Sequence, residues 1–382
     1  MLKLYTVLDI MAIALALIHF GIPLTYYQYM KRKYLNKPWN IKTDSNYKPK
    51  VTIIIPTYNE AKFIKKKLNN IYEQVYPRDK LEVIIVDSAS TDGTPAIVKK
   101  WIRKHSVLNL RLVKEPERRG KARALNVALK YTTGEIVIIT DADSFWPSKN
   151  TINEAVKWFK DQLVGAISCL KKPTGVNVLD VEETYRTYYN TLRIAESKAW
   201  STPIFHGELA AFRRGLLKKL NGFPIDIGAD DSHMATKIVL TGYRAIIPEK
   251  IWCNEVVPHK EYHKWRIRRA QHLIQHFIET LKLHSRVSKQ FKIILEAELF
   301  MHLINPWILI VITAIVIASI AMKSILALTF LTMGLILLLL KPYRTWILSQ
   351  LYLVIASIRN LYAKELTWKK LTKHYMMNTK NE

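Results

Sequence analysis

The chain has 382 residues, a formal net charge of +27 and 49% apolar residues. This length admits one large domain or two ordinary ones, the apolar fraction points to membrane segments, and the charge points to an anionic partner such as nucleic acid, a membrane surface or a phosphorylated substrate. The two cysteines, Cys169 and Cys253, exclude a disulfide framework, and we expect both thiols to be buried and reduced.

The first apolar run, residues 5–28, is long enough to cross a membrane, since a spanning helix needs roughly 20 residues. A cleaved signal peptide is the alternative, but no small-residue cleavage pattern follows the run and Lys31, Arg32 and Lys33 come next. We therefore predict an uncleaved transmembrane anchor over residues 1–30. Cations after a span favour the cytoplasmic side, so the domain that follows is expected in the cytoplasm.

A polar, lysine-rich stretch at residues 31–49 is predicted to be a basic linker. Beyond it, strands and helices alternate as in βαβ units. Strands are expected at 51–56, 81–87, 110–115 and 135–141, and helices at 60–74, 94–105 and 121–131. The pattern predicts an α/β domain over residues 50–260 that is built on an open parallel sheet.

The last third of the chain is expected to lie at or in the membrane. Residues 261–298 are predicted to form interfacial amphipathic helices, and two further apolar runs predict a transmembrane helical hairpin over residues 299–341. Within the basic segment 342–382, residues 345–362 are expected to lie on the cytoplasmic face, because a fourth span would carry the lysines of the tail outside. Much of the positive charge then serves anionic lipid, and nucleic-acid binding is disfavoured.

Polar residues gather where the predicted strands end. Thr57 and Glu60 follow the first strand, Asp87 ends the second, and Asp141 and Asp143 follow the fourth. In open parallel sheets, ligands bind beyond the carboxyl ends of the strands. Neither a glycine-rich dinucleotide loop nor a Walker loop is present, which argues against a dehydrogenase or a P-loop enzyme.

The two acids of Asp141-Ala142-Asp143 repel each other, so positive charge should offset them. A hard divalent cation can do so, since Mg²⁺ typically takes one or two carboxylates together with substrate phosphates. Arg118, Arg119 and Lys121 are placed to meet the same diphosphate from the other side. Alone, an Asp-x-Asp pair is a weak signal, and the basic trio alone is better explained by a solvated helix start. Together they predict a nucleotide diphosphate held through a cation.

The motifs as a set resemble those of the inverting family 2 glycosyltransferases of the GT-A fold. The matching stretches are VTIIIPTYNE (51–60), VIIVDSASTDGT (83–94), GKARALNVAL (120–129), GEIVIITDADS (134–144) and GADDSHMATKIVLTGYRA (228–245). The resemblance covers roughly residues 50–272. It implies an α/β, GT-A type, Rossmann-like nucleotide-diphospho-sugar transferase domain, which here would carry N-terminal and C-terminal transmembrane helices.

The resemblance also implies roles for the matched residues. Nucleotide-sugar binding falls to Thr57, Glu60, Asp87, Lys121 and Asp141, and the metal, Mg²⁺ or Mn²⁺, to Asp143. The family's base belongs to a later acidic pair, usually Glu-Asp, and stands here at Asp230-Asp231, so Asp231 is matched to the base. A carboxylate in reach of the acceptor hydroxyl can remove its proton as it attacks. Helix capping is the alternative role for this pair, and the order of the motifs favours catalysis.

Processive members of the family carry Gln-x-x-Arg-Trp after the base. In our alignment the corresponding stretch, HKWRIRRAQH (263–272), places Trp265, Arg268 and Arg269 at these positions, so the Arg is kept and the Gln and Trp are not. Trp265 is expected either to stack on an acceptor sugar or to lie at the membrane interface. Arg268 and Arg269 are expected to bind an acceptor phosphate or the membrane surface.

The leading hypothesis is an integral membrane hexosyltransferase of the cell membrane with a cytoplasmic catalytic domain, active in polysaccharide or glycolipid biosynthesis. It would move a sugar, with inversion, from a UDP- or GDP-sugar to a polyprenyl phosphate or a lipid-linked glycan. A processive synthase of the cellulose or hyaluronan type is the rival within this class, and the altered Gln-x-x-Arg-Trp stretch and the few spans argue against it. A non-catalytic basic membrane scaffold is the alternative from another class, and nucleic-acid binding ranks behind all three.

Overall fold

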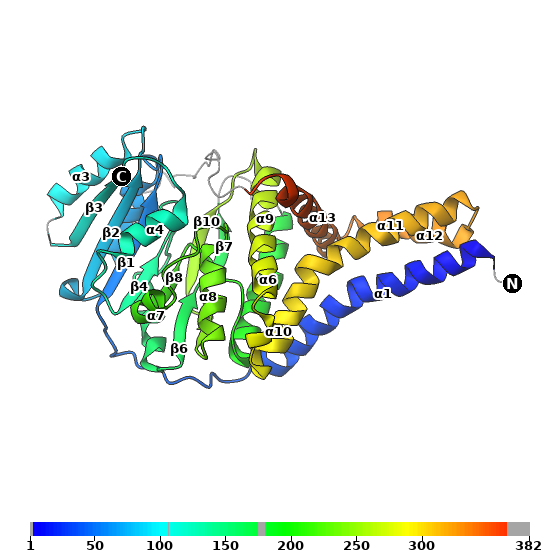
Figure 1. The fold of residues 1–382 in the computed structure, drawn as a ribbon, viewed down its shortest axis with the longest axis horizontal. Helices are drawn as coiled ribbons and strands as arrows, with labels where there is room; N and C mark the ends of the chain where they lie inside the picture. The colour runs from blue at the N-terminus through cyan, green and yellow to red at the C-terminus, as the bar shows by residue number, and fades with distance from the viewer. Residues whose placement is uncertain (1–2, 106, 175–179, 365–382) are drawn as a thin grey trace.

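The computed structural model describes residues 3–105, 107–174 and 180–364. A rounded body contains the sheets, and three helices, α1 (Leu4–Met30), α11 (Asn305–Ala321) and α12 (Ile325–Leu337), extend away from it (Figure 1). The main sheet has seven strands in the order β3 (Asn109–Glu115), β2 (Leu81–Ser88), β1 (Val51–Thr57), β4 (Ile136–Ile139), β8 (Ala210–Arg213), β6 (Val164–Ser168) and β9 (Arg244–Ile246).

The first four strands form the parallel half of this sheet, as the sequence predicts. Val51 of β1 pairs in parallel with Leu81 of β2 on one side and with Ile136 of β4 on the other. Apolar runs that are buried on both faces suit such a sheet. The fourth strand is shorter than the predicted 135–141, because the chain turns away after Ile139 and directs its acids into a cavity instead of against a neighbouring strand.

The other half of the sheet departs from the parallel pattern. β8 lies between β4 and β6 and runs antiparallel to both. A second sheet of three strands, in the order β5 (Ser144–Phe145), β10 (Trp252–Val256) and β7 (Leu170–Thr174), adjoins the main one. These pairings join segments that lie far apart in the sequence, and they bring residues from the second half of the domain beside the ends of β1 and β4.

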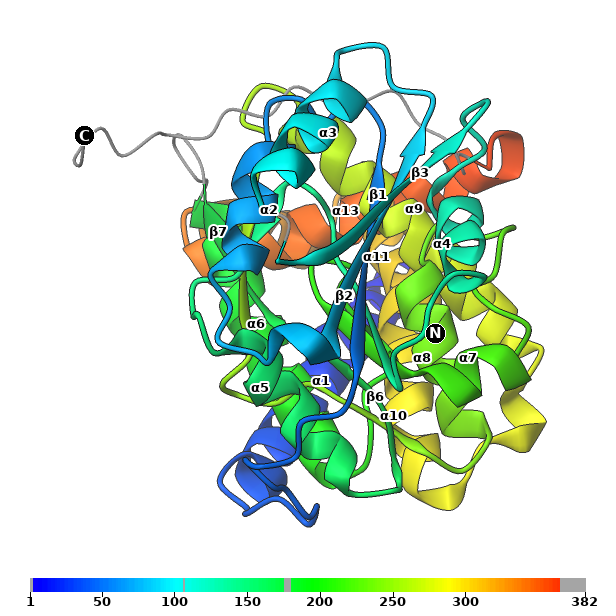
Figure 2. The same cartoon turned by 90° about the vertical axis from the view of Figure 1, so that its left-hand side faces the viewer.

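Helices cover both faces of the main sheet, and a hydrophobic core lies on each side (Figure 2). One core includes residues of α2 (Ile64–Tyr72), α3 (Thr94–Lys104) and α5 (Thr151–Val156). The other includes residues of α4 (Lys121–Leu129), α6 (Asp180–Ala199), α7 (Arg214–Lys219), α8 (Asp230–Leu240), α9 (Tyr262–Leu281) and α10 (Lys289–Leu299). Cys169 and Cys253 are buried in the first core, as expected, and lie within hydrogen-bonding reach of each other.

The predicted helix 60–74 begins later than expected, at Ile64. The residues before it are held by the neighbouring loop, because Glu60 N donates to Thr94 Oγ1 at 2.8 Å and Ala61 N donates to Asp92 Oδ2 at 2.9 Å. Side-chain acceptors of this kind compete with helical hydrogen bonds and favour a turn. The second and third predicted helices end near their expected positions, at Lys104 and Leu129.

Helix α1 is continuous with the body of the protein. Tyr26 and Met30 are buried in the core that faces α6, and Tyr26 Oη donates to Glu196 Oε1 at 2.9 Å. After Met30 the chain makes a π-helical turn over Lys31–Leu35, and Trp39 farther on packs against the opposite core. The stretch predicted as a basic linker therefore lies against the body over part of its length.

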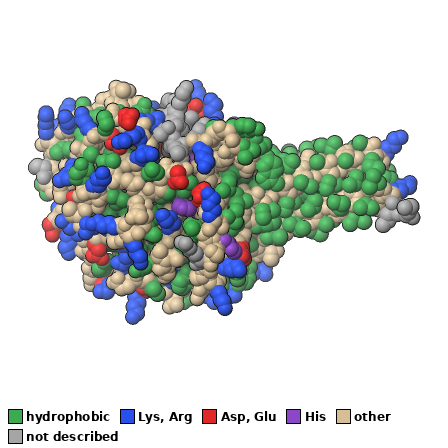
Figure 3. All heavy atoms as spheres, viewed as in Figure 1, with side chains coloured by type: hydrophobic (Ala, Val, Ile, Leu, Met, Phe, Trp, Pro, Cys, Tyr) green, Lys and Arg blue, Asp and Glu red, His purple; other side chains and the backbone are tan. Residues whose placement is uncertain are grey.

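Two helical segments, Leu4–Leu35 and Lys289–Ala321, are long and apolar enough to cross a membrane. Hydrophobic side chains cover the part of the molecule that α1, α11 and α12 form, while Lys and Arg side chains are scattered over the body (Figure 3). Helix α13 (Lys341–Tyr362) bends by 105° away from α12 and packs against α9 and α6. The basic tail predicted beyond it lies outside the described residues, apart from its first positions.

Polar contacts also join the projecting helices. Asp9 of α1 is buried and accepts hydrogen bonds from Ser319 Oγ and, at 2.6 Å, from Ser324 Oγ. His19 of the same helix donates through its Nδ1–H to Asn305 O at 3.1 Å. An unpaired polar group is costly in an apolar environment, so these contacts fix how α1 packs against α11 and the start of α12.

Candidate active site

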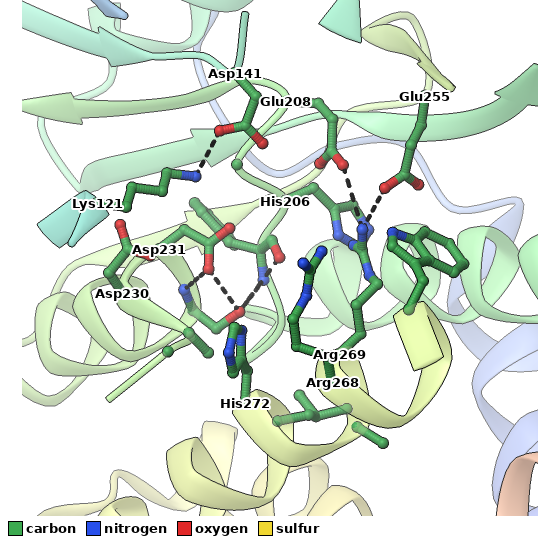
Figure 4. A pocket seen from close by; sticks show the side chains of 18 of the residues that line it. Lys121, Asp141, His206, Glu208, Asp230, Asp231, Glu255, Arg268, Arg269 and His272 are labelled. Carbon is green, nitrogen blue, oxygen red and sulfur yellow. Dashed lines mark hydrogen bonds and ion pairs between the residues drawn. The ribbon is translucent and has the colours of Figure 1, made fainter. Parts of the chain in front are cut away.

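A cavity of about 320 Å³ lies at the carboxyl ends of β1 and β4. Its wall is contributed by the ends of both strands, by the first turns of α4 and α8, by residues 204–208, and by α6, α9 and α13. Figure 4 shows acidic and basic side chains from these elements converging on the cavity. The position agrees with the rule that open α/β sheets bind ligands beyond the ends of their parallel strands.

Lys121 occupies the first turn of α4 and points at Asp141 (Figure 4). Its Nζ lies 2.7 Å from Asp141 Oδ1. The helix can begin here because Gly120 adopts a φ of 104°, a backbone conformation that other residues rarely reach. Burial opposes the charge on Lys121, but the carboxylates of Asp141, Asp230 and Asp231 raise its pKa above the ordinary value, so the ammonium group is retained.

Asp230 and Asp231 begin helix α8 and are both buried. Burial raises the pKa of Asp230 to about 7, against the attraction of Lys121, and the nearby carboxylate of Asp231 adds to the rise. Burial also raises the pKa of Asp231, although Lys121 and the N–H of Ser232, which donates to Asp231 Oδ1 at 2.7 Å, oppose the rise. A raised pKa makes either carboxylate a stronger proton acceptor near neutral pH.

Gly207 faces the space between these groups. A Cβ atom placed on it would lie 2.5 Å from Lys121 Nζ, 3.3 Å from Asp231 Oδ2 and 3.5 Å from Asp141 Oδ2. Its φ is not among the positive values of the chain, so space and not backbone conformation is what requires a glycine here. The absence of a side chain keeps open the place where all three functional groups meet.

A buried network of charges forms the far wall of the cavity, beside α9. Lys171 lies 2.5 Å from Glu208 Oε1 and 2.9 Å from Glu255 Oε2, and Arg269 pairs with Glu255. Burial opposes the ionisation of Glu208, but the positive charges of Lys171 and Arg269 outweigh this effect and hold its pKa well below the ordinary value. Burial, together with Lys171 and Arg186, lowers the pKa of His206, so this imidazole is neutral beside the network.

The residues predicted to bind a nucleotide lie at the opposite end of the cavity. Thr57, Glu60, Ser88 and Arg118 line it, and the Arg118 guanidinium lies 3.9 Å from the centre of the Tyr58 ring. Asp87 is buried behind this wall, where its Oδ1 accepts from Thr57 Oγ1 at 3.3 Å and its Oδ2 from the N–H of Ser90 at 3.1 Å. In this structure Asp87 therefore orients Thr57 and does not itself line the cavity.

Asp143 lines the cavity on the turn that follows β4. Within residues 3–105, 107–174 and 180–364, no three His, Cys, Asp or Glu side chains are grouped to hold a metal ion by themselves. One or two carboxylates facing a diphosphate site nevertheless fit Mg²⁺ or Mn²⁺, which complete their coordination with phosphate oxygens and water. Lys67 fixes the turn from below, since its buried Nζ donates to Thr140 Oγ1 at 2.7 Å and to Ser144 O at 3.0 Å.

Comparison with known proteins gives the family of this chain. The model of glycosyl transferase family 2 matches residues 52–220. A mannosyltransferase from Pyrobaculum calidifontis, solved in complex with GDP-Man and Mn²⁺, is 55% identical to the chain, with a TM-score of 0.87 over 93% of this chain and 99% of that one. The chain belongs to glycosyl transferase family 2.

Other relatives are more distant. The probable glycosyltransferase YdaM of Bacillus subtilis is 27% identical over 236 residues, which are 58% of this chain and 55% of that protein. The chain thus spans about half the length of that curated relative. A dolichyl N-acetyl-alpha-D-glucosaminyl phosphate 3-beta-D-2,3-diacetamido-2,3-dideoxy-beta-D-glucuronosyltransferase of Methanococcus voltae is 33% identical over 110 residues, 29% of this chain and 34% of that protein.

These findings confirm the enzyme class and the fold that the motifs predict. The chain is a family 2 glycosyltransferase with an α/β fold of the GT-A kind. The alternative of a non-catalytic scaffold is thereby set aside. The five residues predicted for the nucleotide and the acidic pair predicted for catalysis lie around one cavity, apart from Asp87 behind its wall.

On the side of the cavity that α9 forms, the geometry limits the roles predicted for Trp265, Arg268 and Arg269 in this glycosyltransferase. Trp265 lines the cavity but is 1% exposed and packs against Tyr262 and Tyr352, so little of its ring is available for stacking. Both arginines line the cavity from adjacent positions of α9, and Arg269 forms ion pairs with Glu255 and Glu208.

Several residues of this site are not predicted from the sequence. His206, Gly207, Glu208 and Glu255 line the cavity, and none of them has a role predicted from the sequence. The stretch PIFHGELAAF (203–212) contains a signal that was available, namely a single acid inside an otherwise apolar run. A buried acid in such a run needs a cation or a hydrogen-bond donor nearby, and Lys171 and Arg269 supply the charge here.

Proposed function

We propose that this enzyme is a membrane-bound hexosyltransferase that moves a sugar from a nucleotide-sugar donor to a lipid-linked acceptor with inversion at the anomeric carbon. The observation that carries the proposal is the convergence of Lys121, Asp141 and Asp231 on the open space above Gly207. GDP-mannose is the proposed donor, because the Pyrobaculum relative, 55% identical, was solved with GDP-Man and Mn²⁺.

The nucleotide would occupy the end of the cavity nearest β1 and β2. Thr57 and Glu60 would contact the base and ribose there, with Asp87 holding Thr57 in place, and Asp141 would contact ribose or diphosphate. In the free enzyme Lys121 neutralises Asp141 at 2.7 Å, and in the complex the same ammonium would offset the negative charge of the diphosphate. A donor therefore meets a lysine that is already held in place.

Asp143 is the proposed protein ligand of a divalent metal, Mg²⁺ or Mn²⁺, with the oxygens of the diphosphate as its other ligands. When bound, such an ion neutralises charge that develops on the leaving diphosphate. Lys67 would keep Asp143 in reach of this position, because it fixes both ends of the turn that bears the acid.

Asp231 is the proposed general base. Its Oδ1 already accepts the N–H of Ser232, while its Oδ2 lies beside the space above Gly207. An acceptor hydroxyl in that space would transfer its proton to Oδ2 as its oxygen bonds to the anomeric carbon. The bond from that carbon to the diphosphate oxygen breaks at the same time, and the nucleoside diphosphate leaves with the electron pair. Attack from the side opposite the leaving group inverts the anomeric centre.

Asp230 is proposed to assist the base. It lies next to Asp231 at the start of α8, and with a pKa of about 7 it exchanges its proton near neutral pH. Two neighbouring buried acids titrate as a pair, so the charge of one depends on the other. Protonation of Asp230 would leave Asp231 as the ionised member that faces Gly207.

A membrane location is proposed from the two candidate spans, Leu4–Leu35 and Lys289–Ala321, with the body on the cytoplasmic side as the cations after α1 suggest. The cavity continues to Ser349, Tyr352 and Leu353 of α13, a helix that follows directly on the apolar α12. An acceptor carried by a lipid could therefore reach the site from the membrane side, which favours a lipid-linked acceptor over a soluble one.

The test uses the full-length enzyme in detergent with GDP-mannose, UDP-N-acetylglucosamine and Mn²⁺. Calorimetry should show metal-dependent binding of GDP-mannose, which Asp143→Ala abolishes and Glu73→Ala, a change of an exposed acid outside the cavity, leaves intact. The configuration of the product, read by NMR, should be inverted relative to the donor, and its length should correspond to single transfer. Equal metal-dependent binding by Asp143→Ala, or retention of configuration, would overturn the proposal.

A further inference from the structure

Glu208 carries an oxygen whose hydrogen-bonding capacity is unused. Its Oε1 faces Lys171 at 2.5 Å and Arg269 at 3.7 Å, whereas its Oε2 is buried and, among the described residues, has no hydrogen-bond partner. The side chain as a whole is 4% exposed and lines the cavity. Leaving a buried acceptor unsatisfied costs about 1–3 kcal/mol, and more for a charged group, so such an atom calls for a physical explanation.

The Glu208 carboxylate stays ionised. Lys171 has no exposed surface and bridges Glu208 and Glu255, and Arg269 contacts the same two acids from α9. Against the effect of burial, these two cations hold the pKa of Glu208 well below its usual range. An ionised carboxylate can only accept hydrogen bonds, so whatever meets Oε2 must be a donor.

The position of Glu208 assigns it to the acceptor side of the reaction. In Figure 4, Lys121, Asp141 and Asp231 lie together on one side of the cavity, His206 and Glu208 lie next to this group, and Arg269 and Glu255 lie on the far side near α9. A donor whose diphosphate lies near Lys121 presents its anomeric carbon toward Gly207. The group beyond Asp231, and next to Glu208, then belongs to the acceptor.

We propose that Glu208 is a positioning residue that accepts a hydrogen bond from a hydroxyl of the acceptor sugar, next to the hydroxyl that attacks. The inference rests on the proposed function and deepens it, because it makes the reacting end of the acceptor a sugar and not a phosphate. At neutral pH a phosphate is mostly deprotonated, so it offers few O–H donors, and its negative charge would be repelled by the Glu208 carboxylate. A sugar instead offers neighbouring hydroxyl groups that can donate a hydrogen bond to it.

His206 complements this arrangement. Burial and the surrounding Lys171, Arg186 and Arg269 keep its imidazole neutral, so one ring nitrogen can donate and the other can accept. A second sugar hydroxyl can therefore be bound in either direction on this side of the cavity. Each cation of the wall that contacts Glu208 or Glu255 is already paired with a carboxylate, which leaves polar but locally neutralised surface, suited to a polyol.

The experiment compares the full-length enzyme with Glu208→Gln in transfer from GDP-mannose, with Mn²⁺, to three probe acceptors. These are octyl α-D-mannoside, its monodeoxy analogues and undecaprenyl phosphate. Glu208→Gln should raise the KM for octyl mannoside by about tenfold or more, the worth of a hydrogen bond to a charged group, and leave the KM for GDP-mannose within about twofold. With the unaltered enzyme, one deoxy analogue should have a KM higher than that of octyl mannoside by a similar factor. With Glu208→Gln, the same analogue should show no further rise in KM.

Two variants separate this role from a structural one. Glu182→Gln removes a carboxylate of the same buried network, bonded to Arg186 and Tyr262, that does not line the cavity. It should lower the melting temperature about as much as Glu208→Gln does, with little change in acceptor KM. The double variant Lys171→Met with Glu208→Gln restores the charge balance, and it should recover stability but not the acceptor KM.

The outcomes distinguish this inference from the proposed function. An unchanged acceptor KM in Glu208→Gln, an equal rise in donor KM, or transfer to undecaprenyl phosphate but to no octyl glycoside would overturn the role of Glu208 and leave the glycosyl transfer standing. Absence of GDP-mannose and UDP-sugar binding by the unaltered enzyme would overturn the proposed function, and the inference with it.

Discussion

Replacing Gly207 by Ala tests whether the open space beside Lys121 is where the reaction takes place. The added methyl carbon would lie 2.5 Å from Lys121 Nζ, while ordinary contact begins at 3.4 Å, so the ammonium group must move by about 1 Å. Its ion pair with Asp141, now 2.7 Å, would lengthen, and the methyl group would occupy the space next to Asp231. A displacement of about 1 Å in an active site can cost 10²-fold in rate, or roughly 2.7 kcal/mol in transition-state stabilisation.

The stability of the protein should hardly change in this variant. The atom in the way is the end of a flexible lysine side chain, which can shift without disturbing the backbone. Replacing glycine by alanine at a compatible backbone position also stabilises by about 0.4–1 kcal/mol through the unfolded state, which offsets some of the strain. We therefore expect a melting temperature close to that of the unaltered enzyme.

The assay measures kcat/KM with GDP-mannose and the affinities for GDP and GDP-mannose separately. Gly207→Ala should lower kcat/KM by about 100-fold and weaken GDP-mannose more than GDP, because the methyl group meets the sugar before the nucleotide. The matched control is Gly215→Ala in α7, where a Cβ meets no atom within 4 Å and activity should be normal. Retention of more than about a third of the activity by Gly207→Ala would refute this placement of the reacting groups.

Four further results are expected. Asp231→Asn should lower transfer by about 10² to 10⁴ with donor affinity preserved, and Asp230→Asn should cost less; the reverse order would identify Asp230 as the base. Transfer should fall on acidification, because Asp231, whose pKa burial raises, must be ionised to act as the base, and a rate that does not fall as the pH is lowered would contradict this. Because the folded pKa of Asp230 is raised, its contribution to stability is complete below about pH 4 and is lost as the pH rises through 7, and Asp230→Asn should flatten that loss in thermal melts. Asp9→Ala should lower the free energy of unfolding in detergent by about 1 to 2 kcal/mol, because Ser319 and Ser324 lose their hydrogen-bond acceptor, and should leave the affinity for the donor sugar nucleotide unchanged. An unchanged unfolding midpoint would show that these contacts do not stabilise the packing of α1.

The sequence predicts well which residues gather at the carboxyl ends of the parallel strands, and for a physical reason. Thr57, Glu60, Asp141 and Asp143 follow parallel strands, and such strands bring their carboxyl ends to one edge whatever their spacing in the chain. Lys121 is found in the same way, as the first residue of the helix that precedes β4. Local pattern and topology therefore suffice for these residues.

The side of the cavity beside α9 could not be derived in that way. Glu208 reaches the cavity because β8 inserts antiparallel between β4 and β6, and Glu255 because β10 pairs with β7 in a separate sheet. Neither pairing has a local signature. The burial of Trp265 likewise depends on α13 folding back onto α9, a contact between residues nearly a hundred positions apart that no helical pattern within either segment indicates.

The seating of Tyr26 and Met30 in the core of the body bears on how this enzyme can be handled and how it can respond to its surroundings. Cutting the chain after the apolar part of α1 would open a gap beside α6 and leave Glu196 without its tyrosine partner, so a water-soluble fragment made in this way should aggregate. The same contacts of Tyr26 and Met30 make α1 and the body move as one rigid unit. If α1 spans a membrane, as proposed, a bilayer that tilts this helix to match its own thickness would rotate the sheet with it, and so change the angle between the cavity and the lipid surface.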